Sequence, residues 1–424
     1  MKAFIGLLIL SGSIRSGHQN IRDLWDRDGF GIEIFYTTMS MKRFLFLLRC
    51  VRFDDVKDRP QRREHDKFNA FRNVFETFTS NCEKYYNLGE LTTIDEQLVP
   101  FRGKCPFRQF IPSKPAKYGI KVFTLTDARS MYTKTMEVYL GTQPEGPFRL
   151  SNRPCDVVKR LAKTMAGTGR NITADNWFSS IPLEQDLLEK NITYLGTIRK
   201  NKVEIPPELS NAKQRAVGTS IFAFQKHLTL LSYIPKKNRN VIMISSMHHD
   251  ASIDDRSGEM RKPEIITDYN YTKSGVDTVD EMCATYSTAR RCKRWPLVMF
   301  FRILNIAGIN AQVIYMSNNA ERKLVRRLFL REVGRELVHA QIRKRAACNS
   351  VPRSLREKVL KLSGSTSSGH SEFDVKIRAR CTICPRNMDK KTNQFCSRCS
   401  KTMCLKHMKT VCPHCFDHLN ENNK

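Results

Sequence analysis

Acidic side chains stand where strand-like segments of the chain end. Asp95 and Asp175 each end an apolar segment, and Asp277 and Asp280 lie three apart at the start of an expected helix, hence on one face. Aspartate is a poor strand former, and a carboxylate buried at a strand edge is costly unless it is paired or bound to a cation. Such acids could hold two Mg²⁺ ions, about 3.5–4 Å apart, which would drive an in-line phosphoryl displacement.

Each of these aspartates also has a simpler interpretation. A single aspartate is more often a cap or turn residue than a metal ligand, and Asp277, which follows Gly275, could simply N-cap its helix. The metal site is favoured by the combination of the acids with the strand order and the charge of the chain.

Half of the 14 cysteines form a second group of potential ligands near the C-terminal end. The pairs are Cys381-x2-Cys384, Cys396-x2-Cys399, Cys404-x2-His407 and Cys412-x2-Cys415. Eight ligands in four pairs predict two structural Zn²⁺ sites and reduced thiols rather than disulfides.

The gaps between the pairs favour an interleaved cross-brace without fixing it. One zinc would then bind Cys381, Cys384, Cys404 and His407. The other would bind Cys396, Cys399, Cys412 and Cys415, with His414 as a local competitor. RING ubiquitin ligases use the same arrangement, but the lysines and arginine between these ligands favour a DNA-binding role.

The charge of the chain points to a polyanionic partner. Its 424 residues contain 72 Lys and Arg against 42 Asp and Glu, which leaves a formal net charge of +30. This far exceeds what solubility alone requires, so nucleic acid is the expected partner rather than a membrane surface. No segment is continuously apolar over the ~18 residues that a membrane span needs. The apolar residues 1–10 resemble a short signal peptide but are better explained as a buried helix.

The spacing of apolar residues predicts the elements that would position these ligands. Helices are expected at 41–50 and 68–86, then strands at 91–95, 118–126 and 131–140, a helix at 155–165, a strand at 171–175, a helix at 182–190 and a strand at 194–198. A β-rich insertion with strands at 222–233 and 241–245 precedes helices at 277–286, 297–315 and 321–345, and a linker at 363–369. The order is βββ, α, β, α, β, with an insertion before the last helices.

Around the acids the chain resembles the piggyBac transposase family. The matching stretches are 93–97 (TIDEQ), 101–108 (FRGKCPFR), 111–121 (IPSKPAKYGIK), 173–178 (TADNWF), 275–280 (GVDTVD) and 294–296 (RWP), together with the cysteine tail. The resemblance covers nearly the whole chain.

This resemblance implies an α/β fold with a ribonuclease-H-like core. The family's catalytic aspartates match Asp95, Asp175 and Asp277, and a further functional acid matches Asp280. The implied reaction is Mg²⁺-dependent cleavage at transposon ends, with hairpin formation and joining to TTAA targets. Positions where the family's DNA passes match Arg102, Lys104, Arg199 and Lys202. A homodimer on double-stranded terminal repeats, located in the nucleus, is the expected assembly.

The same resemblance suggests a division into domains. A helical dimerisation and DNA-binding region would comprise 1–90 and 287–360, the catalytic core 91–202 and 264–286, the β-rich insertion 203–263, the linker 361–376 and the zinc domain 377–418.

At its front the chain departs from the family, whose members usually begin with a longer, often acidic leader. A truncation, a misplaced start or a domesticated copy would each explain this. The alternative function is therefore a catalytically silent, sequence-specific DNA-binding protein, and a RING-like ligase is a third candidate.

Overall fold

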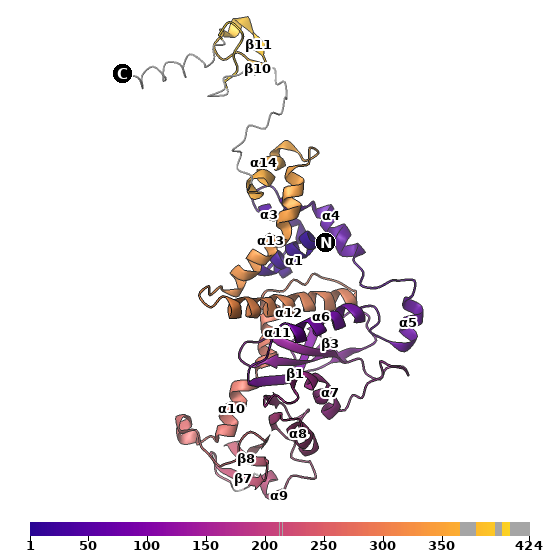
Figure 1. Ribbon diagram of the computed structural model, residues 1–424, viewed down its shortest axis with the longest axis vertical. Coiled ribbons are helices and arrows are strands. Elements are labelled where there is room, and N and C mark those ends of the chain that lie inside the picture. The colour runs from indigo at the N-terminus through magenta and orange to yellow at the C-terminus, as the bar shows by residue number, and fades with distance from the viewer. Residues whose placement is uncertain (212, 214, 365–378, 395–400, 408–424) are drawn as a thin grey trace, which may run out of the picture. The chain divides into compact units, whose positions relative to one another are not determined.

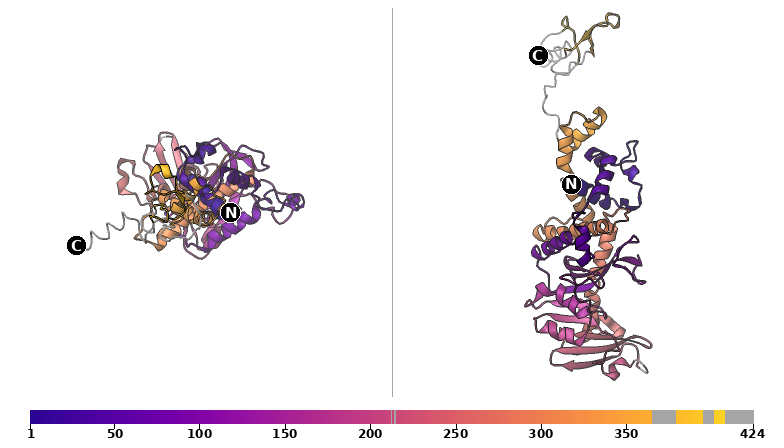
Figure 2. Two further views of the ribbon diagram at one scale, coloured as in Figure 1. Left: turned by 90° about the horizontal axis from the view of Figure 1, so that it is seen from above. Right: turned by 90° about the vertical axis from the view of Figure 1, so that its right-hand side faces the viewer.

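The computed structural model describes residues 1–211, 213, 215–364, 379–394 and 401–407 (Figures 1 and 2). The chain divides into two compact units, Met1–Gly364 and Ser365–Lys424. The larger unit contains a mixed sheet with helices on both faces, in agreement with the predicted α/β class.

One sheet of nine strands forms the centre of the larger unit, in the order β2-β3-β1-β5-β6-β9-β8-β7, with β4 also paired to β3. The strands are β1 (Leu91–Pro100), β2 (Arg108–Phe110), β3 (Tyr118–Asp127), β4 (Thr133–Val138), β5 (Asn171–Ala174), β6 (Thr193–Thr197), β7 (Ser220–Gln225), β8 (Leu228–Lys236) and β9 (Arg239–Ser245). The pairs β1–β3 and β3–β4 are antiparallel, whereas β5 is parallel to β1 and β6 is parallel to β5. The three strands predicted first are thus the antiparallel β1, β3 and β4, and those predicted next are the parallel β5 and β6.

Two strand predictions in this sheet are wrong. The segment predicted as one strand at 222–233 is the hairpin of β7 and β8, which turns at Lys226 and His227. The sequence places the end of the first strand at Asp95, but β1 continues to Pro100, paired throughout with β3. The acidic pair Asp95-Glu96 interrupts the apolar pattern in mid-strand, and tertiary pairing overrides that local signal.

Two layers of helices cover the sheet. On one face α7 (Pro154–Leu161) and α8 (Ile181–Leu188) pack on Ile94 and Phe123. On the other face α11 (Gly275–Thr285) and α12 (Trp295–Asn318) pack on Val99 and Val122, and α6 (Arg72–Lys84) joins this layer (Figure 1). Val122 and Phe123, neighbouring residues of β3, therefore enter different cores, as the two-residue period of a strand requires.

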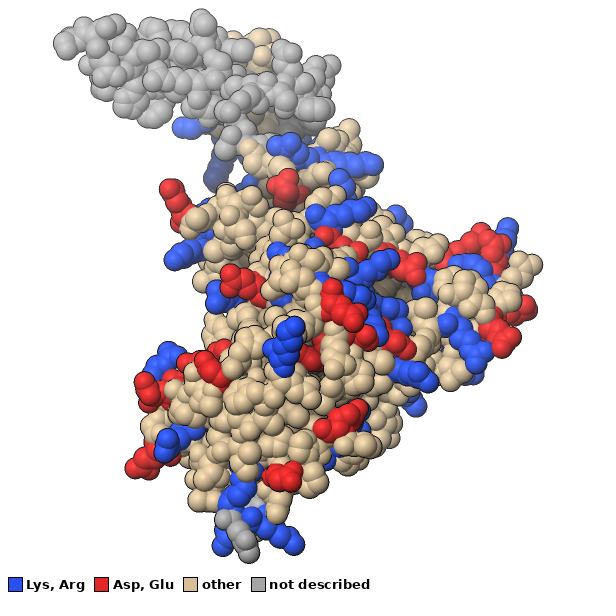
Figure 3. All heavy atoms as spheres, turned by 60° about the horizontal axis from the view of Figure 1, so that its bottom comes forward, with Lys and Arg blue, Asp and Glu red and all other residues tan. Residues whose placement is uncertain are grey.

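The segment predicted as a β-rich insertion extends this sheet instead of forming its own. Strand β9 pairs with β6, β8 pairs with β9, and β7 pairs with β8 at the edge of the sheet. Helix α9 (Pro207–Ser210) lies within this segment, and α10 (Glu264–Thr272) follows it. On the face of the molecule drawn in Figure 3, charges of both signs surround a largely uncharged area.

The remaining helices form the helical region of the larger unit. They are α1 (Lys2–Ser13), α2 (Ile21–Leu24), α3 (Glu33–Thr38), α4 (Met41–Cys50), α5 (Arg59–His65), α13 (Arg326–Ala346) and α14 (Arg353–Leu362). Helix α1 is almost wholly buried, as predicted for the apolar N-terminal run. It packs on α13 at Gly6 and Gly334, where an added Cβ would come within 3 Å of neighbouring atoms.

Among the described helices, α12 is long and apolar enough to cross a membrane by length and composition. Arg302 and several asparagines interrupt its apolar residues, so the sequence shows no continuous apolar run there. Half of its most apolar window is buried in the structure, and a helix from the core of a soluble protein passes the same test. The helix is therefore weak evidence for a membrane span.

Candidate active site and zinc cluster

The register of two parallel strands brings the first two candidate acids together. Strands β1 and β5 pair from Leu91 with Asn171 to Ile94 with Ala174, so the next residue on each is Asp95 and Asp175 respectively. Asp175 immediately follows its strand, and its Oδ1 accepts the Trp177 N–H at 2.9 Å. The two carboxylates thus stand at the same end of the parallel segment.

The third acid is delivered by the close approach of α11 to β1. The helix begins at Gly275, where an added Cβ would lie 2.6 Å from Oγ1 of Thr93, so a side chain there would collide with the strand. The Thr93 hydroxyl also donates to the Thr272 carbonyl at 2.6 Å. Asp277 therefore lies in the first turn of α11, over the C-terminal end of the parallel strands.

Asp277 is not an N-cap, because the cap position belongs to Ser274 and no side chain caps this helix. Instead, its Oδ1 accepts a hydrogen bond from Lys114 Nζ at 3.0 Å. Lys114 is in the loop between β2 and β3, and its positive charge also acts on Asp95. The lysine links the acid on α11 to the acid on β1.

The carboxylates of this site are poorly solvated. Burial, with the negative charges of Glu96 and Asp175, raises the pKa of Asp95 to about 8 against the opposing charge of Lys114. Burial also raises the pKa of Asp175, and the charge of Glu96 adds to this. Burial alone would lower the pKa of Lys114, but the charge of Asp95 and the hydrogen bond to Asp277 raise it instead. The site therefore favours an added positive charge.

The donor set suits a hard divalent cation such as Mg²⁺, since it consists of carboxylate oxygens and is open to solvent at Asp277, whose side chain is 61% exposed. However, the three aspartates are not gathered as closely as a loaded site requires. In the described parts of the chain, one group of three or more potential ligands has all its donor atoms within 4.8 Å of one another, and it is a Cys/His group. In this more widely spaced arrangement, Asp277 is hydrogen-bonded to Lys114.

The titration of Asp95 gives a measurable stability effect. A carboxyl with a folded-state pKa near 8 keeps a proton that the unfolded chain loses near pH 4, so folding loses stability as the pH rises between these values. We expect metal-free wild type to lose stability relative to Asp95→Asn by up to about 1.4 kcal/mol per pH unit between about pH 5 and 7. Urea unfolding at several pH values measures this. A constant difference across the range would contradict it, and Asp186→Asn, on the surface of α8, is the control.

The fourth predicted acid has a different environment. Asp280 is on the same face of α11 as Asp277, but its carboxylate forms an ion pair with Arg302 of α12. The side chain of Arg302 is 8% exposed, and its Nε has no hydrogen-bond partner. Asp280 therefore fastens α11 to α12.

The basic residues predicted to contact DNA lie on two sides of the acids. Arg102 is exposed and lies over the ring of Tyr118 at 5.8 Å, and Lys104 is exposed nearby. Arg199 donates to the side chain of Asn176, the residue after Asp175, at 3.5 Å. Lys202 is half-buried in the turn that follows.

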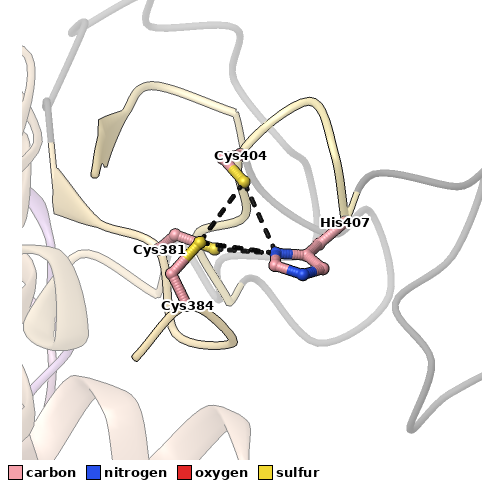
Figure 4. Close-up of side chains that lie close together, drawn as sticks. All are labelled: Cys381, Cys384, Cys404 and His407. Carbon is pink, nitrogen blue, oxygen red and sulfur yellow. Dashed lines mark hydrogen bonds between the residues drawn. The ribbon is translucent and has the colours of Figure 1, made fainter. Parts of the chain in front are cut away.

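The smaller unit gathers one of the two zinc ligand sets predicted from the sequence (Figure 4). Cys384 Sγ lies 3.6 Å from Cys404 Sγ, and His407 Nδ1 lies 3.4–3.7 Å from the three sulfurs. Tetrahedral zinc with Zn–S of about 2.3 Å and Zn–N of about 2.0 Å has edges of about 3.5–3.8 Å. Cys381, Cys384, Cys404 and His407 therefore fit such an ion.

A short hairpin of β10 (Ala379–Arg380) and β11 (Lys391–Thr392) carries the first of these ligands. The second predicted ligand set, Cys396, Cys399, Cys412 and Cys415, lies outside the described residues, as does His414.

The structure adds residues to the site whose roles the sequence did not predict. Glu96 acts electrostatically on both Asp95 and Asp175. Tyr269 is half-buried; burial raises its pKa, and the charges of both aspartates add to this. Of these residues, only Glu96 had a recognisable sequence signal, because it is an acid inside an apolar strand. The contacts of Lys114 and Arg302 could not be predicted, because they join elements that are far apart in the sequence.

Comparisons with known proteins agree with this architecture. The family model described as Transposase IS4 matches residues 1–312. The human PiggyBac transposable element-derived protein 3 is 24% identical over 322 residues, covering 72% of this chain and 53% of the relative. The human PiggyBac transposable element-derived protein 2 is 21% identical over 327 residues, covering 73% and 54%. The chain thus spans about half the length of these curated relatives.

A solved structure gives a longer match. The cryo-EM structure of a piggyBac transposase synaptic complex with hairpin DNA superposes with a TM-score of 0.81 at 38% sequence identity, covering 97% of this chain and 87% of that one. Together with the family model, this match shows that the chain belongs to the piggyBac transposase family.

Proposed function

We propose that the chain is a cut-and-paste DNA transposase that cleaves DNA at transposon ends, forms hairpins on the excised element and joins its 3′ hydroxyls to TTAA targets. The observation that carries the proposal is the placement of Asp95 and Asp175 at the end of paired parallel strands, with Asp277 above them. Membership of a transposase family and the DNA-bound structural relative support it.

The acids would hold Mg²⁺, two ions in the proposed scheme, through Asp95, Asp175 and Asp277. When bound, the ions would activate the attacking oxygen and stabilise the leaving oxygen. The chain's own task is to position the DNA, because phosphoryl transfer needs little else from the protein. Arg102 and Arg199, on two sides of the acids, would contact phosphates and hold the scissile bond in line.

Two adjoining clefts of about 600 and 670 Å³ in the helical region suit the flanking DNA, and they share Arg52, Arg294 and Leu297. Eleven Lys and Arg residues line them against one acid, Asp54, which already pairs with Arg59. Such an unbalanced cationic surface attracts a phosphate backbone. We further propose a homodimer, because two DNA ends must be brought together, and action in the nucleus, where the DNA is.

A cleavage and insertion assay tests the function. Purified chain with Mg²⁺ is incubated with the inverted repeats that flank its own gene and with a target plasmid. We expect strand cuts at the repeat ends and sequenced insertions at TTAA. Binding to the repeats with no strand cut would favour the alternative, a catalytically silent sequence-specific DNA-binding protein.

The cysteine-rich tail is proposed to hold two structural Zn²⁺ ions in a cross-brace, with Cys381, Cys384, Cys404 and His407 around the first. Elemental analysis of the purified chain is expected to give two zinc ions per chain, and one on Cys384→Ser. A zinc content that Cys384→Ser leaves unchanged would contradict the assigned ligand set.

A further inference from the structure

The loop between β2 and β3 presents Lys114 to the acidic site on a rigid support. Its backbone is closed by hydrogen bonds from Ile111 N–H to the Lys117 carbonyl at 2.8 Å and from Lys117 N–H to the Lys114 carbonyl at 3.0 Å. Pro112 and Pro115 restrict the backbone on both sides of the lysine. The loop therefore holds Lys114 at a defined place.

The ammonium group of Lys114 occupies the position of a counter-ion. It lies 3.0 Å from Asp277 Oδ1, and its side chain is 17% exposed. Its charge also acts on Asp95 and Glu96. Within the described residues, no other Lys or Arg forms an ion pair with any of the three aspartates.

A single ammonium and a divalent ion compete for the same carboxylates. Neighbouring acids oppose one another's ionisation, and Lys114 supplies one compensating charge and three donors in the metal-free site. It holds Asp277 while the three aspartates remain too far apart to share an ion. For an ion to bind all three, Asp277 must leave the lysine.

We propose that Lys114 is the resident counter-ion of the metal-free site, and that a divalent cation binds only by displacing its ammonium group from Asp277. The proposal rests on the proposed function, because it assumes that the three aspartates bind metal. The lysine stabilises the empty site and weakens metal binding by the same interaction, as linkage requires.

Manganese binding to the full chain tests the exchange. The protein is loaded with zinc, dialysed against metal-free buffer and titrated with Mn²⁺, with free Mn²⁺ counted by electron paramagnetic resonance. Lys114→Met keeps most of the length of the side chain and removes its charge. We expect its Kd for Mn²⁺ to fall by about 5- to 150-fold, the range of typical couplings. Its melting temperature without Mn²⁺ should fall, and its gain on adding Mn²⁺ should exceed that of wild type.

Lys117→Met is the matched control, because Lys117 belongs to the same loop but is exposed. An unchanged or higher Kd in Lys114→Met would overturn the proposal, and so would an equal fall in Lys117→Met, which would indicate only a change in overall charge. Asp95→Ala separates this outcome from a failure of the proposed function. If Asp95→Ala leaves Mn²⁺ binding intact, the acids are not the metal site; if it abolishes binding while Lys114→Met does not tighten it, only the role of Lys114 is wrong.

Discussion

Replacing Asp175 by asparagine is expected to reduce metal-dependent strand cleavage by at least about 10³-fold, or roughly 4 kcal/mol of transition-state stabilisation. The substitution keeps the shape of the side chain and its hydrogen bond from Trp177 N–H. It removes the charge that stands beside Asp95 at the end of the parallel strands. The fold should therefore survive while the site loses a ligand.

Single-turnover cleavage of a terminal-repeat duplex in Mg²⁺ measures this effect. Asp186→Asn is the control, since Asp186 pairs with Lys159 on the surface of α8 and has no part in the proposed site. Wild-type cleavage rates in Asp175→Asn, with metal dependence retained, would refute the assigned site. Unchanged DNA binding by the inactive variant would separate chemistry from recognition.

The sequence predicted the layers of the fold better than the surroundings of the site. Alternating apolar residues predict β3, and helical spacing predicts α12, because burial on one or more faces dictates residue type locally. The extent of β1 was underestimated, since pairing with β3 continues through the acids. The continuity of the sheet from β6 to β9 could not be predicted either, because pairing between distant strands leaves no local pattern.

The same limit applies to the site. Aspartates at 95 and 175 were recognisable because acids are unusual in an apolar segment. The contacts within the site were not recognisable. Lys114 and Asp277, for example, are 163 residues apart and meet only where α11 packs on β1. The four ligands of the zinc cluster were easier to predict from the sequence, because ligand pairs separated by two residues reflect local geometry.

Asp280 illustrates how an acid predicted to belong to the site can have a contact that spacing does not reveal. From its position one turn after Asp277 it could be a further ligand, yet its carboxylate is engaged by Arg302. A buried guanidinium is costly unless paired, so this ion pair fixes where α11 lies on α12. Because α11 carries Asp277, we infer that Asp280 contributes to catalysis as a positioning residue.

Removing one partner of this pair is therefore expected to be strongly destabilising. Arg302→Met fills a similar volume but leaves Asp280 beside an apolar helix without its partner, and should lower the free energy of unfolding by about 3–5 kcal/mol. The double variant Asp280→Asn with Arg302→Met leaves no unpaired charge and should recover much of this loss. Urea denaturation of the four proteins in the cycle measures the coupling.

The activity of the same four proteins distinguishes positioning from metal binding. If Asp280 only fastens α11, the double variant should regain cleavage together with stability, and Mn²⁺ affinity should change little. If Asp280 is itself a ligand, the double variant should be stable but remain inactive, with weakened Mn²⁺ binding. The contact with Arg302 favours the first result, because the pair already uses the carboxylate that a metal would need.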